Sequence, residues 1–152
     1  MDCGPASDGC RILGYPLPVT VGEGEAKVNG RQKPRILVVE DELMVGLLME
    51  DMVSDFGGEV VGPVSRFDRA MELAQEAEVD AAVLDIDLAG IPAYPVAKVL
   101  RARGIPLIFA TGYGESVLSA DFKSHLVLTK PFSQRDFDEA VSAALFAGPA
   151  NE

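Results

Sequence analysis

Short apolar runs rich in β-branched residues alternate with segments of helical apolar spacing from residue 34 onward, and this alternation restricts the fold more than any other feature. The apolar runs predict strands over residues 35–39, 59–62, 79–84, 105–110 and 126–129. Helical spacing predicts helices over residues 42–56, about 65–74, 92–103, about 115–121 and 133–147. Each predicted strand is followed by a predicted helix, which makes five β/α units.

Strands read as continuous apolar runs when helices cover both faces of their sheet. Five such strands separated by helices predict an α/β fold with a doubly wound, five-stranded parallel sheet and five helices. The expected strand order is the flavodoxin-like 2-1-3-4-5, in which ligands bind at the carboxyl edge of the sheet. Functional residues are therefore expected directly after the strands.

The chain of 152 residues is long enough for one domain of ordinary size. Residues 1–33 are rich in glycine and proline and lack either apolar period, so they predict a disordered N-terminal extension. Residues 34–147 form the predicted domain, and residues 148–152 form a short tail. Both cysteines lie in the extension, with a spacing that indicates neither a zinc site nor a disulfide framework.

The net charge of −11 lies entirely in residues 34–152, because the first 33 residues hold four acids and four bases. Such an acidic surface repels nucleic acid and anionic lipid, so we expect no direct DNA binding and no membrane partner. No apolar stretch of about 20 residues and no export signal is found, which predicts a cytoplasmic protein.

Acidic residues follow two strands that are adjacent in the predicted topology. Glu40, Asp41 and Glu42 come after the first strand, and Asp85 and Asp87 come after the third. Close carboxylates resist joint ionisation, so such a cluster usually holds a hard divalent cation, and Mg²⁺ is the common intracellular choice. The alternative is that these acids only face a helix N-terminus. We accept that alternative for Glu42 and favour the metal for the others.

Asp85 directly follows an apolar strand and so reaches the rim beside the expected metal, where a carboxylate can act as a nucleophile toward a phosphoryl group. Lys130, after the fifth strand, is available as a cation for that group. Thr111 and Gly112, after the fourth strand, supply a hydroxyl and backbone N–H groups. Each residue alone is weak evidence, and their joint placement predicts an aspartyl phosphate.

Four motifs in this order, at residues 36–42, 83–87, 110–112 and 129–132, together resemble a response regulator receiver domain of the CheY-like type. The resemblance covers about residues 34–147. It implies that Asp85 is phosphorylated by a histidine kinase or histidine phosphotransferase and that Thr111 and Lys130 sense the phosphoryl group. It also implies an Mg²⁺ site whose ligands are the carboxylates of Glu40, Asp41 and Asp85 and the backbone carbonyl of Asp87.

The Phe-Ala-Thr-Gly-Tyr stretch at residues 109–113 resembles the single-domain FAT GUY receivers of alphaproteobacteria, a group tied to general stress signalling. Ordinary receivers place an aromatic residue where this chain has Val127, so we hypothesise that Tyr113 and its loop carry the signal instead. Many receivers also place a proline where this chain has Ala89. Asp87 and Tyr113 are further candidates for controlling access of water to the phosphorylated aspartate.

The leading interpretation is therefore a regulatory switch that is not an enzyme on a diffusible substrate. No effector domain is expected after the last helix, so the output is expected through an unidentified downstream protein or by phosphoryl transfer, as in a phosphorelay intermediate or a phosphate sink. One alternative is a phosphohydrolase of the haloacid dehalogenase type, which shares a pair of aspartates like Asp85 and Asp87. Another is a binding module that works without phosphorylation. His125, the one histidine, is expected at the surface.

Overall fold

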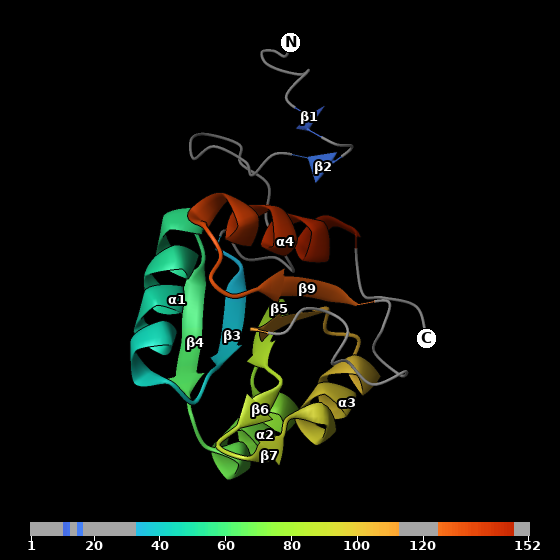
Figure 1. Cartoon of the computed structure of the whole chain (residues 1–152). Helices are drawn as coiled ribbons and strands as arrows, with labels where there is room; N and C mark the ends of the chain where they lie inside the picture. The colour runs from blue at the N-terminus through green and yellow to red at the C-terminus, as the bar shows by residue number, and fades with distance from the viewer. Residues whose placement is uncertain (1–10, 13–14, 17–32, 113–124, 148–152) are drawn as a thin grey trace.

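A computed structural model of the chain describes residues 11–12, 15–16, 33–112 and 125–147. Its centre is a five-stranded parallel sheet in the order β4-β3-β5-β8-β9, which is the predicted order 2-1-3-4-5 (Figure 1). The five strands are β3 (Arg35–Val39), β4 (Glu59–Val64), β5 (Ala81–Asp85), β8 (Leu107–Thr111) and β9 (Leu126–Thr129). The fold is therefore the predicted flavodoxin-like arrangement.

Four helices occur in the described part of the chain (Figure 1). They are α1 (Leu43–Phe56), α2 (Phe67–Glu76), α3 (Tyr94–Ala102) and α4 (Gln134–Ala147). The helix expected over residues 115–121 lies outside the described residues. None of the described helices is long and apolar enough to cross a membrane.

Helices cover both faces of the sheet, and the pleat of each strand divides its side chains between two cores. Leu37 and Val39 of β3 face a core that includes residues of α2 and α3. Ile36 and Val38 of the same strand face a second core with residues of α1 and α4. Because β3 is buried on both sides, it reads as an unbroken apolar run, which is why the period-2 signal is missing from its sequence.

Two helix ends match the local sequence signals and one does not. Gly57, with φ of 101°, ends α1, and the N–H groups of Gly57 and Gly58 donate to carbonyls of the last turn. The N–H of Asp136 donates to Ser133 Oγ at 3.1 Å, so Ser133 caps α4 as predicted. The cap expected near Ser65 is wrong, since α2 begins at Phe67 without a side-chain cap.

The structure departs from the sequence prediction in a few short segments. β5 and β8 extend one residue further than predicted, so Asp85 and Thr111 are the last strand residues rather than the first loop residues. Two pairs of very short strands were not predicted, because two residues are too few to show a period. They are β1 (Arg11–Ile12) with β2 (Tyr15–Pro16), and β6 (Asp87–Leu88) with β7 (Ile91–Pro92).

Candidate functional site

The predicted acids meet at the carboxyl edge of the sheet. Glu40 and Asp41 directly follow β3, and Asp85 is the last residue of the neighbouring strand β5. One carboxylate oxygen from each of the three lies within 4.8 Å of the others. The parallel register between the two strands, which sets Val39 opposite Leu84, produces this convergence.

Lys130 extends from the end of β9 across the edge of the sheet into the acid cluster. Its Nζ lies 2.9 Å from Glu40 Oε1 and 3.4 Å from Asp85 Oδ2. Its backbone N–H donates to the carbonyl of Thr111 at 2.7 Å, which fixes the start of the side chain beside β8. The one ammonium group therefore contacts two carboxylates, one directly after β3 and one at the end of β5.

Glu40 is the most enclosed member of the cluster, with only 1% of its surface exposed. Its Oε1 accepts from the Lys130 ammonium, and its Oε2 accepts from the backbone N–H of Glu42 at 3.2 Å. A buried carboxylate needs such partners, because an unpaired charge away from water is strongly unfavourable. Glu42 itself is exposed and serves the cluster through its backbone, which agrees with its assignment to the helix terminus.

The crowding of negative charge changes the protonation of the cluster. Burial, followed by the charge of Glu40, raises the pKa of Asp85 from 3.8 to about 7, while the Lys130 ammonium acts in the opposite direction. Burial by itself would lower the pKa of Lys130, but its contacts with Glu40 and Asp85 raise it. Without a further cation, the ionised form of Asp85 is therefore less favourable than that of an ordinary exposed aspartate.

The arrangement of donors meets the requirements of a divalent cation. Hard cations such as Mg²⁺ prefer several carboxylate oxygens, and Glu40, Asp41 and Asp85 offer one each at a single point. Burial and the charge of Glu40, which raise the pKa of Asp85, both disfavour its ionised form, and a cation at this point would stabilise that form. The residues present therefore fit a hard divalent ion.

The residues predicted to sense a phosphoryl group lie at the same edge. Thr111 ends β8 beside Asp85's strand and is 3% exposed, and Gly112 follows it on the surface. A Cβ added at Gly112 would meet no atom within 4 Å, so the space around its backbone is open. Tyr113 lies outside the described residues, and its proposed role stays a prediction.

The loop after β5 holds a contact that the sequence analysis missed. The N–H of Asp87 lies 3.4 Å from Asp85 Oδ1, while the exposed Asp87 carboxylate accepts from the N–H of Gly90 at 3.2 Å. The N–H of Ala89 donates to Asp41 Oδ2 at 3.0 Å. The Ala-Gly pair lacks the Asn-Gly or Asp-Gly signal of a two-residue hairpin loop, and its contact with Asp41 depends on the tertiary fold.

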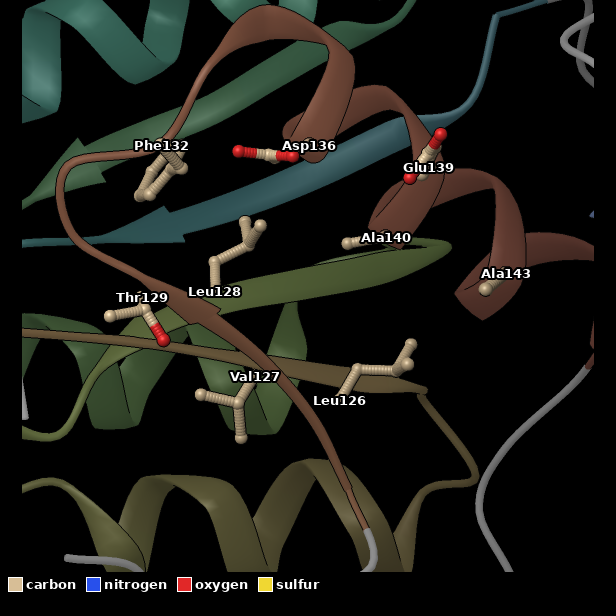
Figure 2. Close-up of a pocket in the computed structure, with 9 residues that line it drawn as sticks. All are labelled: Leu126, Val127, Leu128, Thr129, Phe132, Asp136, Glu139, Ala140 and Ala143. Atoms are coloured by element: carbon tan, nitrogen blue, oxygen red, sulfur yellow. The ribbon is translucent and has the colours of Figure 1, made fainter. Parts of the chain in front are cut away.

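Val127 lies half-buried in β9 opposite Phe109 and is among the residues that line a groove of about 350 Å³ along β9 and α4. Its side chain points away from α4 (Figure 2) and packs against the core next to α2 and α3. Figure 2 shows acidic side chains, Asp136 and Glu139, on the α4 side of this groove. The surface position expected for His125 is wrong. His125 is 8% exposed, and its ring packs edge-on against Phe109 at a centroid distance of 6.0 Å.

These observations agree with a comparison of the chain with known families. The response regulator receiver domain family matches residues 36–142, which is most of the domain predicted from the sequence. The chain therefore belongs to the response regulator receiver domain family.

Particular relatives refine this assignment. SdrG from Sphingomonas melonis Fr1 is 35% identical, with a TM-score of 0.66 over 73% of this chain and 95% of SdrG. The response regulator PhyR from Brucella abortus is 30% identical, with a TM-score of 0.66 over 76% of this chain and 49% of PhyR. The transcriptional regulatory protein PdtaR of Mycobacterium tuberculosis is 26% identical over 73% of this chain and 56% of PdtaR. The chain spans about half the length of the curated relatives that it matches.

Proposed function

We propose that the protein is a stand-alone phosphoacceptor switch of a two-component or phosphorelay system, with Asp85 as the acceptor. The observation that carries this proposal is the convergence of Glu40, Asp41, Asp85 and Lys130 at one point of the sheet edge. Residues 34–147 form the receiver domain, with residues 1–33 as an extension and residues 148–152 as a tail. The proposed setting is the cytoplasm, where a histidine kinase or histidine phosphotransferase supplies the phosphoryl group.

The side chains divide the chemistry between them. Asp85 attacks the phosphorus of a phosphohistidine; the new O–P bond forms as the N–P bond breaks, and the imidazole leaves with the electron pair. Mg²⁺, held by Glu40, Asp41, Asp85 and the backbone carbonyl of Asp87, would neutralise charge on the transferring oxygens. Because Lys130 already contacts Asp85 over 3.4 Å, it is placed to pair with the phosphoryl group once it is attached.

The phosphoryl donor needs a surface beside Asp85, and α1 offers one. Leu43 and Met44 in its first turn are 73% and 76% exposed, and Leu47 and Leu48 one turn later are also exposed. A hollow of about 270 Å³ lined by Asp41, Leu43 and Leu47 joins this apolar surface to the acid cluster. Exposed apolar residues next to a reactive group are typical of a protein-binding surface. We propose that the histidine-bearing donor docks here.

The signal leaves through a downstream protein whose identity is open. Thr111 and Gly112 are proposed to close on the phosphoryl group, and the adjoining Tyr113 loop is proposed to change with them. Because Val127 replaces the usual aromatic residue, we rank the groove between β9 and α4 below the Tyr113 loop as an output surface (Figure 2). The resemblance of residues 109–113 to the FAT GUY receivers supports a role in stress signalling.

The test uses two-dimensional amide NMR with Mg²⁺ and then beryllofluoride, which mimics a phosphoryl group on an aspartate. We expect shifts around Asp85, Thr111 and Lys130 in the wild type and none in Asp85→Ala. A folded wild-type spectrum without any response would refute phosphoacceptance and favour a phosphorylation-independent binding module. Steady turnover of p-nitrophenyl phosphate would instead favour the haloacid dehalogenase type of phosphohydrolase.

A further inference from the structure

The hairpin after Asp85 has an uncommon backbone conformation at its two central residues. β6 and β7 pair antiparallel, and the two residues between them, Ala89 and Gly90, have φ values of 55° and 89°. Positive φ at both central residues is the conformation of a type I′ turn, which glycine, asparagine and aspartate favour. Ala89 is the one non-glycine residue with a positive φ in the part of the chain that the structure describes.

This turn directs a backbone N–H group at the acid cluster. The N–H of Ala89 donates to Asp41 Oδ2 at 3.0 Å, across a separation of 48 residues in the chain. A carboxylate has two oxygens, so the bond leaves the second oxygen of Asp41 for the cluster with Glu40 and Asp85. The hydrogen bond therefore orients Asp41 without removing it from the cluster.

Core packing and hydrogen bonds hold the hairpin in place and so fix the direction of the Ala89 N–H. Leu88 in β6 is 1% exposed and belongs to the core next to α2 and α3. Where the hairpin ends, the N–H of Ala93 donates to the carbonyl of Ile86 at 2.7 Å. Inside the turn, the Asp87 carboxylate accepts the N–H of Gly90. The position of the Ala89 N–H thus follows from a packed side chain and backbone hydrogen bonds on both sides.

We propose that Ala89 is a positioning residue whose backbone N–H orients the Asp41 carboxylate for a divalent cation. This inference rests on the proposed function, because it assigns an outer hydrogen bond to one of the proposed Mg²⁺ ligands. Such outer partners typically contribute about 10- to 100-fold to metal affinity. A proline at residue 89 would lack the N–H and would hold φ near −65°, so the residue type matters here through the backbone alone.

The experiment measures Mg²⁺ affinity of the full chain by amide NMR titration in the wild type, Ala89→Pro and Ala89→Gly. We expect Ala89→Pro to weaken binding by about tenfold or more. Ala89→Gly keeps the N–H and adopts a positive φ readily, so its Mg²⁺ affinity should stay close to that of the wild type. A folded Ala89→Pro protein with wild-type affinity would overturn the inference alone, whereas a wild type that binds no Mg²⁺ would overturn the proposed function as well.

A second measurement needs no proline variant and no metal. Amide hydrogen exchange is compared between the wild type and Asp41→Ala in metal-free buffer. The amide of Ala89 should exchange several-fold faster in Asp41→Ala, because its acceptor is gone. The amide of Gly90, which donates to Asp87, should keep its rate and serves as the internal control. Equal exchange of Ala89 in the two proteins would overturn the inference even if Ala89→Pro failed to fold.

Discussion

Replacing Asp85 by asparagine should make the metal-free protein more stable, and the gain should grow with pH. The folded-state pKa of Asp85 is about 7, above its ordinary value of 3.8, because of burial and the charge of Glu40. For an acid whose pKa is raised by folding, stability is complete below the unfolded pKa and is lost as the pH rises through the folded pKa. Asp85 therefore destabilises the metal-free fold from about pH 4 upward, because folding then requires uptake of a proton, and the cost reaches its full size above about pH 7, where the buried group is ionised.

The size of the effect follows from these two pKa values. A rise of about three pKa units, at about 1.4 kcal/mol each, corresponds to about 4 kcal/mol at pH 8. At pH 5 the same relation leaves less than half of this cost, since the folded protein has taken up the proton. The Asp85 side chain is only 14% exposed, so solvent screening reduces these values little. Because asparagine replaces the protonated acid imperfectly, we expect Asp85→Asn to gain about 3 kcal/mol at pH 8 and about 1 kcal/mol at pH 5.

The assay is urea unfolding followed by circular dichroism, with EDTA present, at both pH values. Asp51→Asn is the matched control, because Asp51 is an exposed acid on α1, and its free energy of unfolding should change by less than about 0.5 kcal/mol at either pH. A gain for Asp85→Asn that is no larger at pH 8 than at pH 5 would refute the argument from charge crowding. So would a loss of stability at pH 8.

Two further substitutions test the contacts around the site and the last helix. Lys130→Met should lower the free energy of unfolding by about 3 kcal/mol in EDTA, because Glu40 is left buried without its cation, and Mg²⁺ should reverse part of this loss. Urea unfolding with and without Mg²⁺ measures both the loss of stability and its reversal. Lys98→Met, on the exposed face of α3, is the control. A loss of unfolding free energy below about 1 kcal/mol for Lys130→Met would contradict the expectation. Ser133→Ala should lower the free energy of unfolding by about 1 kcal/mol, because it removes the acceptor of the Asp136 N–H. Ser133→Thr should keep most of the wild-type stability. Equal urea midpoints for the wild type and both variants would contradict this expectation.

The local sequence determined the order and type of the five strands of the central sheet and of the four described helices. Apolar runs and helical spacing depend on neighbouring residues, so they are readable without a partner segment. Once five β/α units are present, chain connectivity and crossover handedness leave one common strand order, and it places Glu40, Asp85 and Lys130 at one edge. The predicted group of residues could therefore be named before any distance was known.

Only the tertiary structure decided how these residues interact. The 2.9 Å contact between Lys130 and Glu40 and the raised pKa of Asp85 depend on strand register and on burial by the surrounding elements. The bond from Ala89 to Asp41 joins residues 48 positions apart, and the burial of His125 depends on its packing against Phe109. These properties arise from contacts between segments that are distant in the chain. A local sequence pattern depends only on neighbouring residues, so it does not determine how closely such segments approach each other.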